Sequence, residues 1–199
     1  MRIGIFGGSF NPIHNGHIAL GTAMLKAMSL DEVWYLVSPQ NPLKQNTTLL
    51  DENTRLHLVQ LALSDHPHLI ASDYEFYLPR PSYTWDTLQA LKHDHPNDTF
   101  VLIIGQDNLE CFDKWAHYKD LLQNYEIAVY PRISSNSCFS KESRASSISS
   151  LPISVHFIDF PLVNISSTEI REMIKKGEDI TPFVPLKVAQ EVYNLSLYR

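Results

Sequence analysis

One stretch near the N-terminus decides the fold: Ile3-Gly4-Ile5-Phe6-Gly7-Gly8-Ser9-Phe10-Asn11-Pro12-Ile13-His14-Asn15-Gly16-His17-Ile18. Its apolar start predicts a buried strand, the glycine pair predicts a turn, and the apolar spacing over 18–28 predicts a helix that packs back on a sheet. This order of strand, glycine turn and helix is typical of phosphate binding, because backbone N–H groups at a helix start attract anions.

The residue types in this stretch suit an anionic ligand. Gly7 and Gly8 let the backbone approach a polyphosphate closely, since they carry no side chain. His14 and His17 fall three residues apart in the expected first helical turn, so both imidazoles share a face near the positive helix end, and Gly16 keeps the space between them open. A metal-binding pair and a chance surface pair are the alternatives.

Composition limits the classes of protein to which the chain can belong. With 199 residues, 44% hydrophobic and 19% charged, it is expected to form a single domain over 1–199. A net charge of -6 argues against nucleic-acid partners. Cys111 and Cys138 are far apart, which predicts reduced thiols rather than a disulfide or a zinc site. The absence of a long apolar run predicts a cytoplasmic protein without a membrane partner.

Apolar runs alternate with helical patterns along the rest of the chain, which predicts an α/β protein with a mostly parallel sheet. Further strands are expected at 33–37, 69–72, 99–105, 126–130 and 154–158. Further helices are expected at 51–64, 87–92, 118–123 and 185–197. Between strands, 133–153 is rich in serine and is predicted to be a mobile surface loop.

A second phosphate-binding pattern lies near the C-terminus, in Ile165-Ser166-Ser167-Thr168-Glu169-Ile170-Arg171. Ser166 and Glu169 fit a capping box, so one interpretation gives the serine a purely structural role. The same helix start also presents hydroxyls, backbone N–H groups and Arg171 together. In the proline-containing loop 38–44, Asn41 and Lys44 fall at the sheet edge where a second substrate could bind, although a solvated lysine is the usual alternative.

The segment 7–17, with His14-Asn15-Gly16-His17, resembles the signature of the nucleotidyltransferase superfamily that carries a His/Thr-x-Gly-His motif. Within it the chain is most similar to the bacterial nicotinate-mononucleotide adenylyltransferases. The resemblance implies a Rossmann-like, doubly wound, mostly parallel sheet of five to six strands with helices on both faces. It also implies that ATP and nicotinate mononucleotide give deamido-NAD and pyrophosphate, with Mg²⁺ carried mainly by the ATP phosphates and no metal site formed by protein residues alone.

Site residues follow from the resemblance position by position. It implies catalytic roles for His14, His17 and Arg171. It implies ATP contacts for Gly7, Gly8, Ser9, Phe10, Gly16, Gly105, Asp107, Arg132, Ser166, Ser167 and Thr168. It implies contacts with the mononucleotide for Asn41, Lys44, Tyr83, Thr84 and Trp115. The order Pro131-Arg132 reverses the Arg-Pro order of many family members.

The chemistry expected at this site needs no strong base, because the attacking phosphate is already ionised near neutral pH. We therefore expect in-line attack without a covalent intermediate, driven by positioning and charge neutralisation. Two alternatives remain at this stage: a sister transferase for phosphopantetheine or nicotinamide mononucleotide, and a non-catalytic nucleotide sensor. The sequence also leaves open a homo-oligomer.

Overall fold

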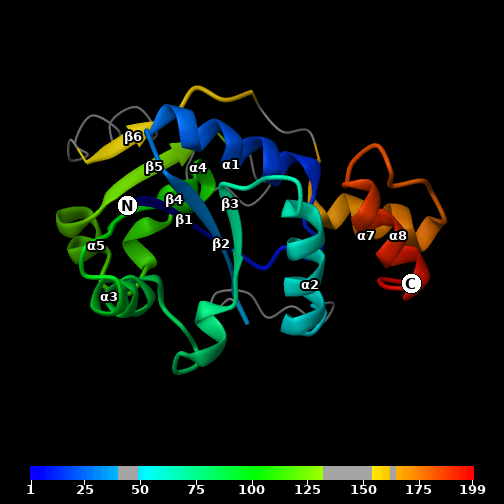
Figure 1. The fold of residues 1–199 in the computed structure, drawn as a ribbon, viewed down its shortest axis with the longest axis horizontal. Helices are drawn as coiled ribbons and strands as arrows, with labels where there is room; N and C mark the ends of the chain where they lie inside the picture. The colour runs from blue at the N-terminus through cyan, green and yellow to red at the C-terminus, as the bar shows by residue number, and fades with distance from the viewer. Residues whose placement is uncertain (40–48, 132–153, 162–164) are drawn as a thin grey trace.

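A sheet of six parallel strands forms the centre of the computed structural model, which describes residues 1–39, 49–131, 154–161 and 165–199 (Figure 1). The strands lie in the order β3-β2-β1-β4-β5-β6, and every neighbouring pair is parallel. Their bounds are β1 (Arg2–Gly8), β2 (Glu32–Val37), β3 (Leu69–Ser72), β4 (Thr99–Gly105), β5 (Glu126–Tyr130) and β6 (Val155–Phe157). The predicted strands and the predicted doubly wound sheet are confirmed.

The strand order reverses between β1 and β4, and this reversal creates a crevice. The two strands pair from Arg2 with Thr99 to Ile5 with Leu102. Beyond that point they no longer pair, although β1 continues to Gly8 and β4 to Gly105. In open α/β sheets, ligands bind where strands separate in this way at their carboxyl ends.

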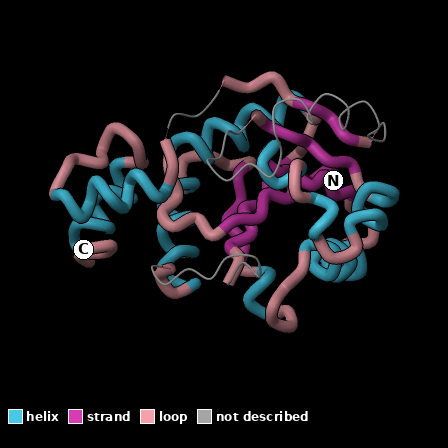
Figure 2. Tube along the Cα trace, turned by 180° about the vertical axis from the view of Figure 1, so that it is seen from behind, coloured by secondary structure: helices cyan, strands magenta, loops and turns pink. Residues whose placement is uncertain are grey.

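Helices cover both faces of the sheet, as the sequence predicts (Figures 1 and 2). The helices are α1 (Asn15–Ala27), α2 (Glu52–Leu63), α3 (Thr84–Asp94), α4 (Gln106–Leu109), α5 (Tyr118–Asn124), α7 (Ser167–Lys176) and α8 (Leu186–Asn194), with 3-10 turns η1 (Tyr74–Tyr77) and η2 (Phe112–Lys114). One apolar core joins α1, α2, α7 and α8 to the sheet, and a second joins α3 and α5 to its other face. The pair α7 and α8 lies beyond α2, beside the C-terminus.

Three details differ from the sequence prediction. Helix α3 begins at Thr84, three residues earlier than expected, because the Thr87 N–H already bonds the Tyr83 carbonyl at 3.0 Å. Helix α8 ends at Asn194 and not at 197. Cys111 is disulfide-bonded, so the prediction of a reduced thiol there is wrong, and Cys138 lies outside the described residues.

The contact between α1 and β2 depends on a glycine. Tyr35 on β2 is fully buried, and its hydroxyl donates to the His17 carbonyl at 2.8 Å. A Cβ at Gly21 would overlap that hydroxyl and lie 2.9 Å from the ring carbon Cζ. The missing side chain at position 21 therefore lets α1 lie against the sheet with the correct orientation of its first turn.

Gly21→Ala is expected to lower the free energy of unfolding by about 1–3 kcal/mol, since overpacking outweighs the helix propensity gained by alanine. Urea denaturation followed by circular dichroism measures the change. Tyr35→Phe removes the atom that the new methyl meets first, so the double variant should lose less stability than the two single variants combined. Strictly additive losses would show that the two side chains do not compete for this space.

Candidate active site

A cavity of about 340 Å³ lies at the carboxyl ends of β1 and β4. It is bordered by the glycine turn and by the N-terminal ends of α3 and α7, which are far apart in the sequence. The predicted site residues that line it are Gly7, Gly8, Ser9, Phe10, His17, Tyr83, Thr84, Gly105, Trp115, Ser166, Ser167, Thr168 and Arg171. The structure thus brings most of the predicted residues to one place.

Some predicted residues lie elsewhere. His14, Gly16 and Asp107 do not line this cavity, and Asn108 lines it where Asp107 was expected. Asn41, Lys44 and Arg132 lie outside the described residues, as does the segment 133–153.

The two histidines form a stacked pair at the start of α1. Their ring centroids are 3.7 Å apart with the planes 29° from parallel, and His14 is buried behind His17. The backbone N–H of His14 donates to Nδ1 of His17 at 3.2 Å. Because Nδ1 accepts this bond, a neutral His17 carries its proton on Nε2. His17 can therefore offer a hydrogen-bond donor to a ligand without being charged.

The loop after the glycine turn is held by three donors from two distant helices, α2 and α7. Arg55 on α2 donates to the Ser9 carbonyl at 2.7 Å, and Arg171 on α7 donates to the Asn11 carbonyl at 2.7 Å. Ser167 Oγ donates to the Pro12 carbonyl at 2.8 Å. These bonds fix the N-terminus of α7 beside the glycine turn.

The side chain of Asn11 is held as well. The hydroxyl of Tyr198, the penultimate residue, donates to Asn11 Oδ1 at 2.9 Å, and the Leu50 N–H donates to the same oxygen at 3.3 Å. Burial raises the pKa of the Tyr198 hydroxyl, so it remains a donor at neutral pH. The end of the chain is thereby joined to the loop that borders the cavity.

The N-terminus of α7 has the capping box that the sequence predicts. Ser166 N–H donates to Glu169 Oε2 at 2.7 Å, and Glu169 N–H donates to Ser166 Oγ at 3.3 Å. Arg171 also donates to Thr168 Oγ1 at 3.1 Å. The N–H groups of the first turn and the Arg171 guanidinium lie together at the cavity, an arrangement that suits phosphoryl oxygens.

The N-terminus of α3 forms the opposite wall. Its N-cap, Tyr83, makes no side-chain capping bond, and Ser82 Oγ donates instead to Glu75 at 3.2 Å. The first N–H groups of α3 are therefore available for an anion.

Sequence reasoning missed several polar side chains of the cavity, among them Glu75, Asn108, Lys114 and Tyr130. Asn108 and Lys114 are next to the predicted Asp107 and Trp115, so a wider window around those positions would have included them. Glu75 stands out as the only acid in the aromatic run Tyr74–Tyr77. Tyr130 ends a strand and gave no separate signal.

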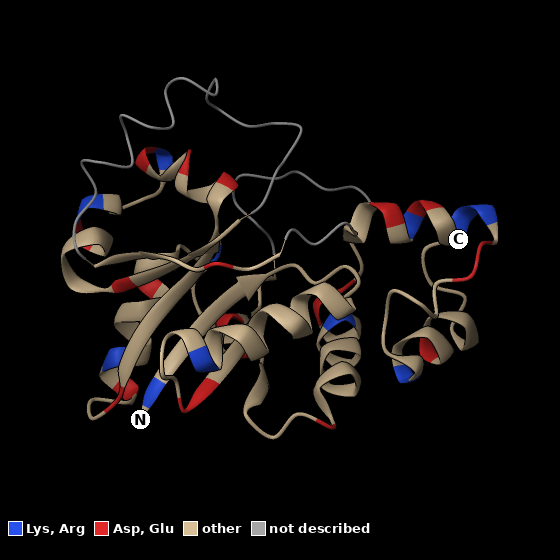
Figure 3. Ribbon diagram, turned by 90° about the horizontal axis from the view of Figure 1, so that it is seen from above, with Lys and Arg blue, Asp and Glu red and all other residues tan. Residues whose placement is uncertain are grey.

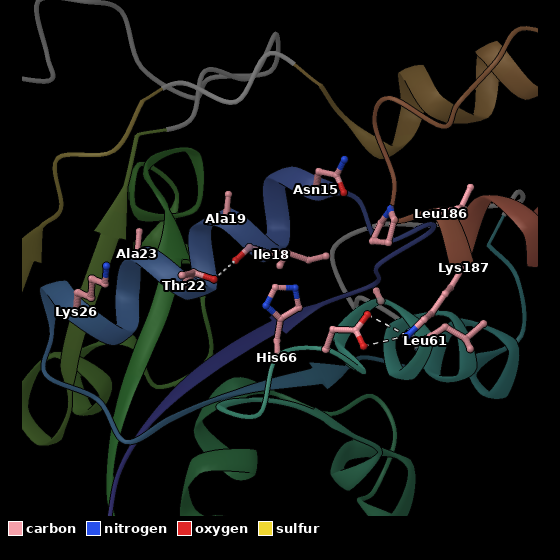
Figure 4. Close-up of a pocket in the computed structure, with 13 residues that line it drawn as sticks. Asn15, Ile18, Ala19, Thr22, Ala23, Lys26, Leu61, His66, Leu186 and Lys187 are labelled. Atoms are coloured by element: carbon pink, nitrogen blue, oxygen red, sulfur yellow. Dashed lines mark hydrogen bonds and ion pairs between the residues drawn. The ribbon is translucent and has the colours of Figure 1, made fainter.

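A larger cavity, of about 860 Å³, lies between α1, α2 and the start of α8 (Figure 4). It is lined largely by apolar side chains such as Ile18 and Leu186. Lys187, at its edge, donates to both Asp65 carboxylate oxygens at 2.9 and 3.1 Å. None of the predicted site residues lines this larger cavity. Its size alone therefore does not identify it as the reactive site.

Charged residues of both signs are distributed over the described part of the chain. Figure 3 shows acidic and basic positions interspersed over the helices that it draws. Within the ranges that the structure describes, no group of three or more His, Cys, Asp or Glu side chains could hold a metal ion. Over the same ranges, no helix is long and apolar enough to cross a membrane.

Comparison with known proteins identifies the family. The model of the family described as "Cytidylyltransferase-like" matches residues 5–173. The chain is 44% identical over 199 residues to the "Probable nicotinate-nucleotide adenylyltransferase" of Flavobacterium johnsoniae, with all of both chains covered. It is 46% identical over 183 residues to the protein of the same name from Bacteroides fragilis, covering 92% of this chain and 87% of that one. The chain belongs to the nicotinate-nucleotide adenylyltransferases of the cytidylyltransferase-like family.

A solved structure supports the fold of this adenylyltransferase. It is that of Plasmodium falciparum nicotinic acid mononucleotide adenylyltransferase complexed with NaAD, with a TM-score of 0.79 and 20% identity. The match covers 99% of this chain and 97% of the other. At this identity the similarity concerns the fold, and the family assignment depends on the sequence relatives.

Arg55 binds backbone carbonyls of the segments that border the cavity of this adenylyltransferase. It is fully buried, and its guanidinium donates at 2.7–3.0 Å to the carbonyls of Leu50, Ser9, Ser38 and Pro39. Burial lowers the pKa of Arg55, although guanidinium remains charged at any physiological pH. These contacts assign Arg55 a structural role.

Arg55→Ala should lower the free energy of unfolding by about 3–5 kcal/mol, because four carbonyls lose their donor and a buried space opens. Arg55→Lys should recover little, since one ammonium group cannot reach carbonyls that surround a planar guanidinium. Urea denaturation tests both variants. Arg80→Ala is the control, because its ion pair with Glu52 is exposed and should contribute less than about 1 kcal/mol. Equal losses at positions 55 and 80 would contradict this structural role.

Proposed function

We propose that this chain, as one nucleotidyltransferase domain over 1–199, transfers the adenylyl group of ATP to nicotinate mononucleotide and releases pyrophosphate. One observation carries the proposal: the glycine turn with His17, the N-terminus of α7 with Arg171, and the N-terminus of α3 with Trp115 share one cavity. The names of the full-length relatives support the same reaction.

The phosphate side of the proposed site consists of donors. Gly7 lines the cavity, and a Cβ there would meet no protein atom within 4 Å, which leaves the backbone open to a triphosphate. His17 and Arg171 would donate to phosphoryl oxygens and stabilise charge that develops as pyrophosphate leaves. His14 would act through His17, which it orients by stacking and by its backbone N–H.

The remaining predicted site residues keep, in this proposal, the ligand contacts that the resemblance implies. The α7 start, Ser166 to Thr168, would bind the ATP phosphates. Gly105 and Asp107 would lie at the adenosine, Arg132 at the phosphates, and Asn41 and Lys44 at the mononucleotide. Asp107 does not line the cavity, so its assignment depends on the resemblance alone.

The pyridine side of the proposed site favours an acid. A carboxylate accepts hydrogen bonds from the free N–H groups at Thr84 and the residues after it. A carboxamide also presents N–H donors, which would face those N–H groups without a partner. Trp115 would stack on the pyridine ring.

The Mg²⁺ ion expected for an ATP-using transferase fits this site as part of the substrate. Mg²⁺ commonly binds through substrate phosphates and retains several waters. The described cavity lining offers hydroxyls and one acid, Glu75, which already accepts bonds from Ser82 and Thr87. When bound, the ion would neutralise triphosphate charge.

ATP and nicotinate mononucleotide are the proposed partners of a cytoplasmic enzyme. Light scattering would decide whether the enzyme forms a homo-oligomer.

A coupled assay of pyrophosphate release tests the proposed reaction. With ATP as donor, the acid mononucleotide should support turnover much better than the amide mononucleotide or phosphopantetheine. Preference for phosphopantetheine would indicate a sister transferase. ATP binding without turnover with any of the three acceptors would indicate a nucleotide sensor.

His17→Ala should lower kcat by about 10²–10³-fold, the usual loss when one donor to a transition-state charge is removed. Steady-state kinetics at saturating ATP measure the effect, with circular dichroism to confirm folding. The control is His93→Ala, because the side chain of His93 is 89% exposed. A folded His17→Ala variant with nearly wild-type kcat would exclude a catalytic role for His17.

Trp115→Leu should raise KM for nicotinate mononucleotide about fivefold to tenfold and leave KM for ATP nearly unchanged, because ring stacking contributes about 1 kcal/mol or slightly more. Trp85→Leu is the matched control, since that ring stacks on His117 and does not line the cavity. Equal changes in the two KM values would indicate that Trp115 supports packing alone.

A further inference from the structure

Glu75 is a buried acid in the wall of the proposed mononucleotide subsite. It lies on η1, it is only 7% exposed, and it lines the cavity together with Ser82, Tyr83 and Thr84. The proposed mechanism needs no general base and gives this acid no task. A buried carboxyl group beside the N-terminus of α3 nevertheless affects any anion that binds there.

The partners of Glu75 are hydroxyl groups. Ser82 Oγ lies 3.2 Å from Oε2, and Thr87 Oγ1 lies 3.1 Å from Oε1. The Ser38 side chain forms a third hydrogen bond. No charged group of the described residues is among the causes that shift the Glu75 pKa. The carboxyl group is therefore solvated by neutral dipoles and not by a cation.

The position of Thr87 favours an uncharged Glu75. Its hydroxyl lies 3.1 Å from Glu75 Oε1 and 3.2 Å from the Tyr83 carbonyl, and both of these are acceptors when Glu75 is ionised. A threonine hydroxyl has one proton and cannot donate fully to both. If Glu75 carries a proton, it can donate to Thr87 Oγ1 while Thr87 donates to the Tyr83 carbonyl.

Burial acts in the same direction. It raises the pKa of the Glu75 carboxyl above its ordinary value, although the three hydroxyl hydrogen bonds oppose the shift. Proton binding therefore persists to a higher pH than in a free glutamate.

The titratable neighbours of Glu75 on η1 are Tyr74 and Tyr77, and those at the start of α3 are Tyr83 and Asp86. Those on other elements are Arg55 behind Ser38, and His17, Lys114, Tyr130 and Arg171 around the cavity.

We propose that Glu75 makes the acid-over-amide specificity of the mononucleotide subsite depend on pH: uncharged, it admits a carboxylate at the start of α3, and ionised, it repels one. This inference rests on the proposed function, because it assumes that the pyridine carboxylate binds beside Ser82 and Thr84. A carboxamide carries no charge, so its binding responds much less to the ionisation of Glu75. The discrimination between the two substrates thus becomes a function of pH.

The test measures KM for the acid and the amide mononucleotide from about pH 5 to about pH 8.5 at saturating ATP. The ratio of the acid KM to the amide KM cancels the pH effects that both substrates share, such as the ionisation of their phosphates. In the wild type this ratio should rise about tenfold with pH, as expected for two like charges near each other. In Glu75→Gln, which is neutral at every pH, the ratio should stay at its low-pH value.

The controls separate this role from packing. Glu191→Gln removes an acid on α8 that pairs with His57, and it should keep the wild-type profile. Glu75→Leu removes the hydrogen-bond acceptors as well as the charge. It should therefore weaken the binding of both mononucleotides and lower the free energy of unfolding. A parallel change of both KM values in Glu75→Gln would indicate a structural role and overturn the proposal.

Calorimetric titration of both mononucleotides keeps the two proposals distinguishable. If the wild type turns over the acid mononucleotide but the ratio of the acid KM to the amide KM does not change with pH, the role of Glu75 is overturned. The proposed reaction then remains valid. A wild type that binds the acid with the expected pH dependence but transfers no adenylyl group overturns the reaction alone. Absence of acid binding at every pH overturns both.

Discussion

The carbonyl groups of the loop that follows the glycine turn need hydrogen-bond donors, and this need organises the molecule. The chain at Ser9, Asn11 and Pro12 belongs to no helix or strand, so its carbonyls cannot bond within a regular element. Arg55 and Arg171 supply most of the donors, from α2 and α7. Because these donors come from distant parts of the sequence, their bonds to this one loop bring the N-terminus of α7 next to the glycine turn.

The resulting cavity collects hydrogen-bond donors on a chain with a net negative charge. The chain carries a net charge of -6, yet the cavity wall combines glycine backbone, two helix N-termini, the His17 imidazole and Arg171. Fixed dipoles aimed into an enclosed space stabilise charge more effectively than mobile surface cations, which salt screens. Local arrangement of donors therefore compensates for an unfavourable overall charge.

Much of this arrangement was predictable from the sequence, because its signals are local. Apolar runs marked the strands, Asp51 and Ser166 marked helix starts, and glycines marked the turn. The burial of Arg55 and the bond from Tyr198 to Asn11 were not predictable in detail, since each depends on contacts between distant segments. The early start of α3 was missed because its first turn is closed by the backbone bond from the Thr87 N–H to the Tyr83 carbonyl, without a side-chain cap that the sequence could signal. The disulfide at Cys111 was missed because the spacing of the cysteines gave no indication of pairing.

Glu75 illustrates how one buried group connects local structure to specificity. Its bonds to Ser82 and Thr87 hold the segment that starts α3, so the same carboxyl that shapes the subsite also sets its charge. A neutral residue of the same shape would shape the subsite without adding a charge. An acid there makes the preference depend on proton binding, because the free energy of placing a second anion nearby changes with the first. The helix N-terminus supplies attraction for a carboxylate, and the protonation state of Glu75 decides how much of that attraction the ligand receives.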